Sequence, residues 1–492
     1  MWSASSGRPA STRSRPSTLP GARAADSGRV AVAEESIREP IQAASNKGRA
    51  GPPASPQLSR YHFAMCDSLV ARGARTADGA TLFAKNSDRR GRESQPFVQY
   101  PAAFHARGSR VCCTHVEIDQ VAETYRFMGH SPAWCWGLEH GVNEFGVAIG
   151  NHATWSREPV ELRPGMIGMD LVRLGLERGR NAREALEVIA ALVELHGQGG
   201  SAFAPEGDDG HQNSFSIADG LSAWVLETTA RGWAAREVEG ASLTNALTLG
   251  ANWQIGSRDL ERRALQQGFW QSNRRLDFKA AYSPADWPLH LTKRRQQAAA
   301  RRLEGPALSI SDLKVWLRDH GEEGASPNVD CELSDPDRFS VCMHTDPLVT
   351  TTASIAVRLP EVPEVRPWPV WISFATPCTG IFVPVYLDGA IPACFASAEL
   401  GEDGSGVPSI WSSMRQLQEK AAQDFERTLP ILRAGWREVE SMLDDDRLRV
   451  ESEVSALYVE GDFDAGANLL SRFMETTAER VLAASRRLCE SI

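Results

Sequence analysis

The sequence lacks the marks of three large classes of protein. It contains no uninterrupted apolar run of about 18 residues, the length that a membrane-spanning helix needs. Its N-terminus lacks an apolar core of about 7–15 residues, so no secretory signal is predicted. The formal net charge of −10 argues against a nucleic-acid partner, which requires a basic surface. With 42% hydrophobic and 24% charged residues, the composition is typical of a soluble globular protein.

Cysteine is sparse as well. Nine cysteines in 492 residues are too few for a disulfide scaffold, and the absence of any CxxC pair excludes zinc-ribbon and thioredoxin-like motifs. A reducing compartment, the cytoplasm, therefore fits best, with most cysteines acting as small buried side chains. The eleven histidines are scattered without metal-ligand spacing. The sequence thus predicts neither a metal nor a cofactor.

The common catalytic motifs are also missing. The sequence contains no GxSxG, no HExxH, no phosphate-binding GxxxxGK and no Rossmann GxGxxG. Hydride transfer, kinase and metalloprotease activities therefore lose support.

Residues 1–65 differ from the rest of the chain. They are rich in Ala, Ser, Arg and Pro and show no apolar periodicity, so they cannot bury enough apolar surface to offset their ordering entropy. They are interpreted as a disordered leader, a cleavable targeting or pro-segment, or the product of a start assigned too far upstream. The last two are favoured, because Met65-Cys66 is itself a plausible start. The sequence predicts a hydrolase domain over 66–400 and a helical region over 401–492.

Strand-like segments, then helices, then strands follow from Cys66 onward, which favours an α+β fold of antiparallel sheets faced by helices. Helical periodicity covers 168–177 and 182–195, with Asn181 as the N-cap of the second segment, and a helical block spans 256–320. Beyond residue 408 the chain is predicted to be wholly helical, and it either packs on the core or serves self-association. The predicted strands are 66–70, 81–84, 111–118, 124–128, 146–149, 214–218, 223–227, 232–238, 242–249, 341–344, 351–359, 370–374 and 381–386. One apolar stripe in the C-terminal region is formed by Leu417, Ala421, Phe425 and Leu429.

The first hairpin carries a chemical signal. A hairpin that runs from 66 to 88 has its centre in the turn 76–79, so its two ends lie side by side. This pairing brings Lys85 and Asp88 near Cys66. An ammonium beside a thiol lowers the pKa of that thiol, and a carboxylate there can hold an α-ammonium group or a substrate amine. The alternative is a solvated turn with surface charges.

An ordered series of short motifs resembles the secernins, a family placed with the cysteine dipeptidases of the N-terminal-nucleophile class. The series begins at Met65-Cys66-Asp67-Ser68-Leu69-Val70 and Phe83-Ala84-Lys85-Asn86-Ser87-Asp88-Arg89. It continues through Gly141-Val142-Asn143-Glu144-Phe145-Gly146 and Trp224-Val225-Leu226-Glu227-Thr228. The resemblance is strong over about 66–240 and thinner to about 390. It implies a four-layer αββα sandwich, an architecture shared more distantly with bile-salt hydrolases and penicillin V acylases.

The resemblance also implies a set of site residues. Cys66 is the expected nucleophile, with its own α-amine as base once residue 65 is gone, because such amines titrate near ~7.7–8.0 and thiols near ~8.5. Lys85 and Asp88 match the basic and acidic positions of the relatives' Arg-Asn-x-Asp pattern, with Asn86 as a substrate-binding position. Asn151 and Asn245 are expected to stabilise the oxyanion. A distal arginine completes the site in the bile-salt hydrolases, and the candidates for that position here are Arg294 and Arg295. The segment 293–302 is so basic, however, that a solvated helix face is the favoured interpretation of both.

Several other residues have plain structural interpretations. Trp134 and Trp136 alternate on a predicted strand and are expected in the core. Glu117 and Asp119 share one strand face, where a salt-bridged edge is favoured over a cation site. His152 is expected to be a packing or rim residue.

Three functions remain open. The first is a dipeptidase that cleaves short peptides through an acyl-Cys66 intermediate. The second is a hydrolase of other acyl amides, and the third is a catalytically idle interaction protein. The expected partner is a small peptide or acyl-amide substrate, and a homo-oligomer is possible on sequence grounds.

Overall fold

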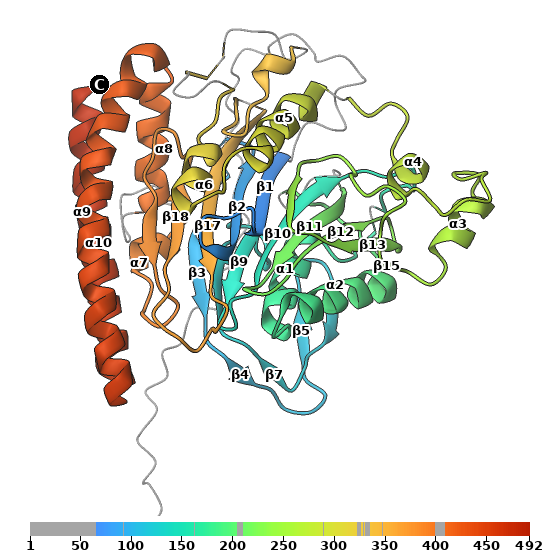
Figure 1. The fold of residues 1–492 in the computed structure, drawn as a ribbon, viewed down its shortest axis with the longest axis horizontal. Coiled ribbons are helices and arrows are strands. Elements are labelled where there is room, and N and C mark those ends of the chain that lie inside the picture. The colour runs from blue at the N-terminus through green and yellow to red at the C-terminus, as the bar shows by residue number, and fades with distance from the viewer. Residues whose placement is uncertain are drawn as a thin grey trace, which may run out of the picture. The chain divides into compact units, whose positions relative to one another are not determined.

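The computed structural model describes residues 65–91, 93–161, 163–203, 210–288, 290–321, 326–327, 329, 335–346, 348–398 and 409–492 (Figure 1). Residues 1–64 of the leader predicted over 1–65, and the predicted boundary at 400 and 401, lie outside these described residues, whereas Met65 is the first residue of a strand.

The first sheet contains the N-terminal hairpin. Its strands run in the order β14-β1-β2-β17-β18-β19, with β16 paired to β17, and every neighbouring pair is antiparallel. The predicted turn over 76–79 is confirmed, and Gly79 adopts a φ of +79°, which favours glycine. The strands are β1 (Met65–Gly73), β2 (Gly79–Arg89), β14 (Gly240–Leu243), β16 (His344–Thr345), β17 (Val349–Leu359), β18 (Val370–Phe374) and β19 (Val383–Val385).

The second sheet is also antiparallel and has the order β15-β13-β12-β11-β10-β9-β8-β3. Consecutive strands are neighbours throughout most of it, as hairpin-length connections predict. Its strands are β3 (Phe97–Tyr100), β8 (Phe127–His130), β9 (His140–Asn143), β10 (Ala148–Thr154), β11 (Gln212–Ala218), β12 (Ala223–Thr228), β13 (Trp233–Glu237) and β15 (Ile255–Gly256).

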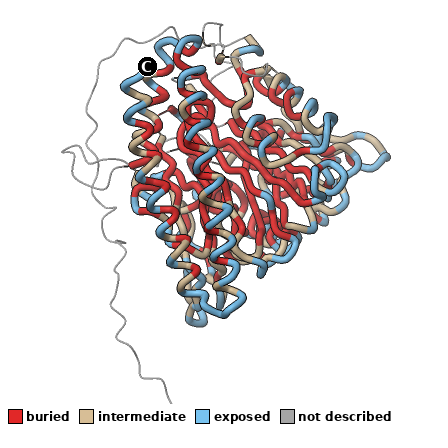
Figure 2. The backbone as a smooth tube through the Cα atoms, turned by 60° about the vertical axis from the view of Figure 1, so that its left-hand side comes forward, coloured by how far each residue is buried: buried red, intermediate tan, exposed pale blue. Residues whose placement is uncertain are grey.

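The two sheets stack face to face and helices cover both outer faces. Side chains at alternate positions divide between two clusters, because successive strand residues point to opposite faces. Val70 and Phe83 belong to the cluster between the sheets, whereas Leu69 and Leu82 pack outward against helices α5 (His290–Glu304) and α6 (Ile310–Leu317). This division produces the buried central strands of Figure 2.

On the second sheet, Ile149 and Phe215 pack outward against α1 (Gly168–Arg178) and α2 (Ala182–His196). The predicted four-layer αββα sandwich is therefore confirmed. Asn181 caps α2 as predicted, since its side chain accepts a hydrogen bond from the backbone of Glu184 at 2.9 Å.

Some local predictions were wrong. The predicted strand 111–118 is a two-stranded hairpin, β5 (Arg110–Cys112) with β6 (Glu117–Asp119). Glu117 and Asp119 do share a face, and both pair with Arg110, at 3.1 and 2.6 Å. The tryptophans at 134 and 136 lie in a turn rather than on a strand, and both are half-buried.

The remaining short elements connect the layers. They are β4 (Ala103–Phe104), β7 (Glu123–Thr124), α3 (Leu260–Gln266), α4 (Phe278–Tyr282), the 3₁₀ turn η1 (Pro336–Arg338) and α7 (Ala393–Ala396).

The C-terminal region is helical, as predicted. It comprises α8 (Ile410–Ala421), α9 (Phe425–Glu460) and α10 (Phe463–Ser491), and the last two lie side by side at one edge of the molecule (Figure 1). Gly461, with a φ of +83°, ends α9. The predicted stripe over 417–429 is buried, but it is divided between α8 and α9 by a break at 422–424.

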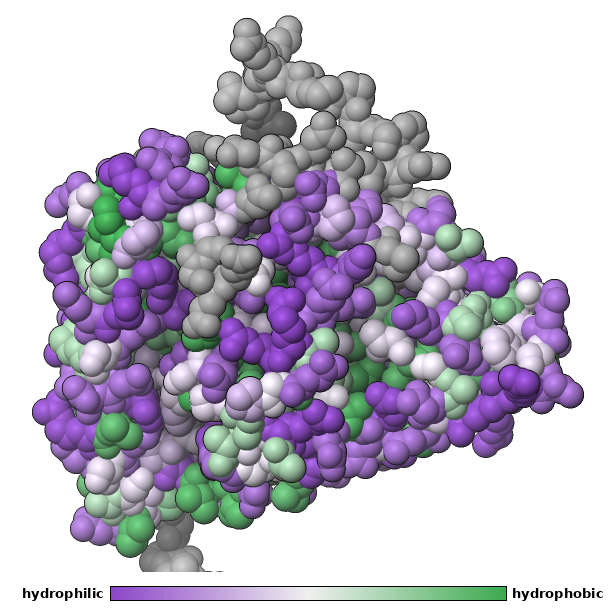
Figure 3. Space-filling view, turned by 45° about the horizontal axis from the view of Figure 1, so that its top comes forward, coloured by the Kyte–Doolittle hydropathy of each residue, from purple (hydrophilic) through white to green (hydrophobic). Residues whose placement is uncertain are grey.

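Among the described helices, none combines the length and apolar character needed to cross a bilayer. On the face drawn in Figure 3, hydrophilic side chains cover most of the described surface, and apolar ones gather in small groups.

Replacing Trp436 tests whether the C-terminal helices are part of the core. Its side chain is fully buried, and its Nε1 donates a hydrogen bond to the carbonyl of Thr379 at 2.7 Å. We expect Trp436→Ala to lower the free energy of unfolding by about 3–5 kcal/mol, measured by urea denaturation. The control Leu448→Ala, at an exposed position of α9, should change it by less than about 0.5 kcal/mol. Equal effects of the two variants would contradict this packing.

Candidate active site

Cys66 is the second residue of β1, and its side chain faces the second sheet. Two residues along the strand, the hydroxyl of Ser68 lies 2.6 Å from that of Ser216 in β11. Because strand residues alternate, Cys66 shares that inner face. Cys66 is paired with Ser87 of β2, and only 2% of its surface is exposed. The thiol therefore lies inside the sandwich, where polar neighbours determine its chemistry.

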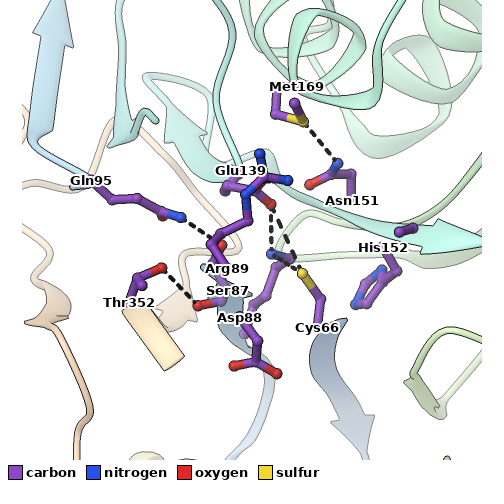
Figure 4. A network of polar contacts seen from close by, with 12 residues as sticks. Cys66, Ser87, Asp88, Arg89, Gln95, Glu139, Asn151, His152, Met169 and Thr352 are labelled. Carbon is purple, nitrogen blue, oxygen red and sulfur yellow. Dashed lines mark hydrogen bonds and ion pairs between the residues drawn. The ribbon is translucent and has the colours of Figure 1, made fainter. Parts of the chain in front are cut away.

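Lys85 is the nearest cation to this thiol. Its Nζ lies 3.4 Å from Cys66 Sγ and 3.4 Å from Glu139 Oε2 (Figure 4). The side chain is completely buried, and Gly150 of β10 provides the space, since a Cβ there would lie 2.4 Å from Lys85 Cδ. The predicted proximity of Lys85 and Cys66 is thus observed, within the interior rather than at a solvated turn.

Glu139 joins two cations from β2. One carboxylate oxygen contacts Lys85, and the other lies 3.4 Å from Nη1 of Arg89, which also pairs with Glu93 at 2.6 Å. Burial alone would raise the pKa of Glu139, but Lys85 and Arg89 hold it below its ordinary value. The carboxylate therefore stays ionised, and two acids balance two buried cations, as buried charges require.

Burial dominates the titration of Cys66. It raises the pKa of the Cys66 thiol to about 12, although Lys85 and the backbone of Asp88 favour the thiolate. With residue 65 attached, the sulfur is consequently a neutral thiol at physiological pH. Its proton points toward Glu139, whose Oε2 lies 3.9 Å from Sγ.

The backbone of Cys66 is held from the other side of the sheet by Arg295. This arginine of α5 is fully buried and contacts Asp67 at 2.9 Å, the carbonyl of Cys66 at 3.3 Å and Asn245 Oδ1 at 2.8 Å. The expectation of a solvated helix face was wrong for Arg295, which is buried against the backbone of Cys66. Arg294 instead donates to the carbonyls of Asp337 and His320.

Asn245 also contacts Cys66, through its side-chain oxygen. Oδ1 accepts a hydrogen bond from the amide nitrogen of Cys66 at 3.3 Å, while Nδ2 donates to the carbonyl of Ala153 at 2.9 Å. The side chain therefore marks the nitrogen that would become the α-amine. Its role as an oxyanion donor stays a prediction.

Asp88 and Asp67 are buried acids on the outer face of the hairpin. Asp88 is paired in register with Met65, and its Oδ1 accepts a hydrogen bond from Thr351 at 2.7 Å. Oδ2 has no hydrogen-bond partner within the described residues. Burial and the nearby Asp67 raise the pKa of Asp88 well above its ordinary value, and burial raises the pKa of Asp67 to about 6 despite Arg295.

Asn86 lies on the same outer face, and its side-chain amide forms hydrogen bonds within the protein through both its nitrogen and its oxygen. Its Nδ2 donates to the carbonyls of Leu317 and Val341, each at 2.9 Å, and its oxygen accepts from Ser354 at 2.7 Å. The predicted substrate-binding position is thus a buried structural one, because the strand alternation turns it away from the thiol.

Asn151 of β10 lies beside Glu139 (Figure 4). With its amide nitrogen turned toward Glu139, it lies 2.9 Å from Oε2 and 2.9 Å from the backbone carbonyl oxygen, which satisfies both groups. His152 is completely buried, and burial together with Lys85 holds its pKa well below the ordinary value. It is a neutral packing residue, as predicted.

Sequence reasoning missed Glu139, Arg89 and the pairing of Asp67 with Arg295. Arg89 and Asp67 are part of the quoted motifs but were given no role, and a count of charges expected on the inner strands would have identified them. Glu139 carries no motif signal. It enters the site because it precedes β9, which pairs with β10 in the second sheet.

Residues 65–262 match the model of peptidase family C69. This segment is similar to that family. It includes Cys66, Lys85, Asp88, Glu139, Asn151 and Asn245, whereas Arg295 lies beyond it. The match supports a hydrolase, and an enclosed thiol is a nucleophile suited to that chemistry.

The C69 segment and its flanks are also similar to solved structures. Two variants of the conjugated bile acid hydrolase from Clostridium perfringens are 13% identical, each covering 63% of this chain and 89% of that chain, with TM-scores of 0.34 and 0.33. An ortholog of N-acylethanolamine-hydrolyzing acid amidase from Caenorhabditis elegans is 12% identical, covering 61% of this chain and 96% of that one, with a TM-score of 0.27.

The raised pKa of Cys66 can be tested by alkylation of a chain that retains residue 65. A thiol of pKa about 12 deprotonates only as the pH approaches that value, so its thiolate fraction at pH 8 is on the order of 10⁻⁴. We expect iodoacetamide at pH 8 to modify Cys66 at least ~100-fold more slowly than the exposed Cys112. Peptide mass spectrometry over time measures both rates in one sample, and equal rates would contradict the assignment.

Proposed function

We propose that the chain is a cysteine N-terminal-nucleophile amidohydrolase that cleaves short peptides through an acyl-Cys66 intermediate. The observation that carries this proposal is the surroundings of one residue. Cys66 Sγ faces Lys85 and Glu139, while its nitrogen faces Asn245. A site that recognises both atoms of one cysteine suits a nucleophile that supplies its own base.

In the proposed mechanism, removal of residue 65 converts the Cys66 amide nitrogen into a primary amine. The amine accepts the thiol proton, and the sulfur forms a bond to the substrate carbonyl carbon. The amine then returns the proton to the leaving nitrogen as the C–N bond breaks. Water attacks the thioester, which releases the acid and restores the thiol.

The surrounding charges support this sequence of steps. Lys85 stabilises the thiolate from 3.4 Å, because a nearby cation favours the charged form. Removal of Met65 leaves Asp88 without its register partner in β1, while its pairing with Thr351 of β17 remains. Asp88 Oδ2 is then available to the α-ammonium of Cys66. Asn151 and Asn245 remain the candidate oxyanion donors. To donate to an oxyanion, the amide nitrogen of each must give up its present hydrogen bond, which Asn151 forms with Glu139 and Asn245 with the carbonyl of Ala153.

Met65 indicates which acyl groups the site accepts. Its side chain is buried in an apolar cluster directly beside the nucleophile, and its departure opens a space of that size. An apolar substrate side chain that fills this space gains about 1.5–3 kcal/mol. The cluster includes Trp134, Ile167, Met169, Phe339, Met343 and Val349.

The same apolar space favours one alternative, hydrolysis of acyl amides with an apolar acyl group. Both reactions share the nucleophile and differ in the leaving group. A catalytically idle interaction protein is the remaining possibility. The eight described cysteines are all free, which supports the proposed location in a reducing compartment such as the cytoplasm.

The test uses a chain that begins at Cys66, verified by N-terminal mass analysis. Cys66→Ser should lower kcat/KM by at least ~10²-fold, because a hydroxyl is a far weaker nucleophile than a thiolate, with an unchanged unfolding midpoint. Cys112→Ser, at an exposed position, is the matched control and should retain full activity.

A panel of substrates separates the alternatives in the same assay. Dipeptides with Met, Leu or Phe at the acyl position should exceed those with Gly by roughly 10–100-fold in kcat/KM. Turnover of N-acyl amides alone would move the assignment to an acylase. Absence of turnover by a folded chain with free Cys66 would leave the idle interaction protein.

A further inference from the structure

Four side chains with metal-ligating atoms converge outside the candidate active site. They are His320, Cys342, His344 and Cys378, all buried, and one ligand atom from each lies within 4.8 Å of the others. The sequence analysis predicted no metal site, because it searched for ligand spacing along the chain. Here the ligands come from three separate segments.

The fold explains how these segments meet. His320 follows the end of α6, Cys342 precedes β16, His344 is the first residue of β16, and Cys378 lies in the turn after β18. The side chains of Cys342 and His344 point toward one another, since Cys342 Sγ lies 3.5 Å from His344 Nε2. The α6 loop is tied to this strand, since the amide of Cys342 donates to the carbonyl of Asp319 at 3.0 Å.

Two ligand-to-ligand distances are close to those around a tetrahedral ion. Nε2 of His344 lies 3.5 Å from Cys342 Sγ and 3.2 Å from Cys378 Sγ. Zinc–sulfur and zinc–nitrogen bonds of about 2.3 and 2.0–2.1 Å place neighbouring S and N ligands roughly 3.6 Å apart. A neutral imidazole nitrogen carries either one proton or one lone pair, so it bonds a single partner. Two sulfurs close to one such nitrogen are better explained by a shared cation.

The surroundings are those of a closed site. The edge of Phe425 packs on the His344 ring with centroids 5.0 Å apart, and Leu429 packs against both cysteines. Four protein ligands under an apolar cover leave no position for water, which distinguishes structural from catalytic zinc sites. Two thiolates would also neutralise a divalent ion in this buried position.

Outer contacts orient the ligand loops. Arg433 of α9 donates to the carbonyls of Cys378 and Gly380 at 3.2 and 2.8 Å, and Arg318 donates to that of Pro377 at 2.9 Å. Such hydrogen bonds around first ligands are typical of protein metal sites. They also connect the cluster to the C-terminal helices.

We propose that His320, Cys342, His344 and Cys378 bind one structural zinc ion. The mixed nitrogen and sulfur set selects zinc over magnesium or calcium, which prefer oxygen. The ion fastens the α6 loop, β16 and the β18 turn together beneath α9. It holds no substrate and lies apart from the thiol of Cys66.

The first experiment measures zinc in the full-length chain, purified without a metal-affinity tag or chelator. Elemental mass spectrometry should find about one zinc per chain, and Cys66→Ser should retain it, which separates this site from the nucleophile. The double variant Cys342→Ser and Cys378→Ser should lose at least ~90% of the zinc. Cys394→Ser, a buried cysteine elsewhere in the core, is the matched control and should retain it.

A second measurement tests the site in the wild-type chain, so that it is informative even when the double variant does not fold. Wild-type chain expressed with cobalt should show thiolate-to-cobalt charge transfer and the visible absorption of tetrahedral cobalt. The proposal is overturned by a wild-type chain that binds less than about 0.1 zinc per chain in zinc-supplemented buffer. A Cys342–Cys378 disulfide in the native protein, or zinc retained in a folded double variant, would overturn it as well.

Discussion

Two cations of β2 and one carboxylate from the opposite sheet hold the candidate site together. Lys85 and Arg89 are charged groups with almost no exposed surface, and such groups are tolerated in a protein interior only when they are paired. Glu139 pairs with both. Because it belongs to the second sheet, the ion pairs also fix how the two sheets meet. The position of Lys85 beside the thiol is therefore a consequence of charge balance as much as of strand register.

The pairing of buried charges also accompanies a separation of the site into two faces of the hairpin. Cys66, Lys85 and Glu139 lie between the sheets, whereas Asp67 pairs with Arg295 of α5 on the outer face. The side chain of Cys66 and its backbone are thus held by different sets of groups, the backbone by Arg295 and Asn245. A change on one face can alter the reactivity of sulfur without moving the nitrogen, and the reverse is also true.

Much of the fold could be predicted from the sequence because local patterns agreed with their environment. The segment 370–374 became β18 with both ends as predicted, and the hairpin argument correctly brought Lys85 to Cys66. The errors came where one pattern fits two structures. The apolar run 111–118 fits one strand or two with a turn, and the basic run 293–302 reads as solvated although one of its faces is buried.

The rest of the candidate site depended on contacts distant in sequence. Glu139 contacts Lys85 across the space between the two sheets. The side chain of Asn86 donates hydrogen bonds to carbonyl groups more than 200 residues away in sequence. The His320, Cys342, His344 and Cys378 cluster is likewise assembled only when three loops meet. No spacing rule covers such cases, because the relevant distance is measured through the fold rather than along the chain.

The burial of Met65 and Cys66 limits when the peptide bond between them is accessible to another enzyme. The bond between them lies within a paired strand, and each residue is 2% exposed, so a separate protease cannot reach it in the finished fold. The sheet that encloses it is completed only when β17 pairs with β2, and β17 is synthesised some 260 residues later. At roughly 5–20 residues per second of translation, this leaves an interval on the order of tens of seconds. For the proposed removal of residue 65, this burial restricts trimming by another enzyme to that interval and assigns any later cleavage to the folded chain itself.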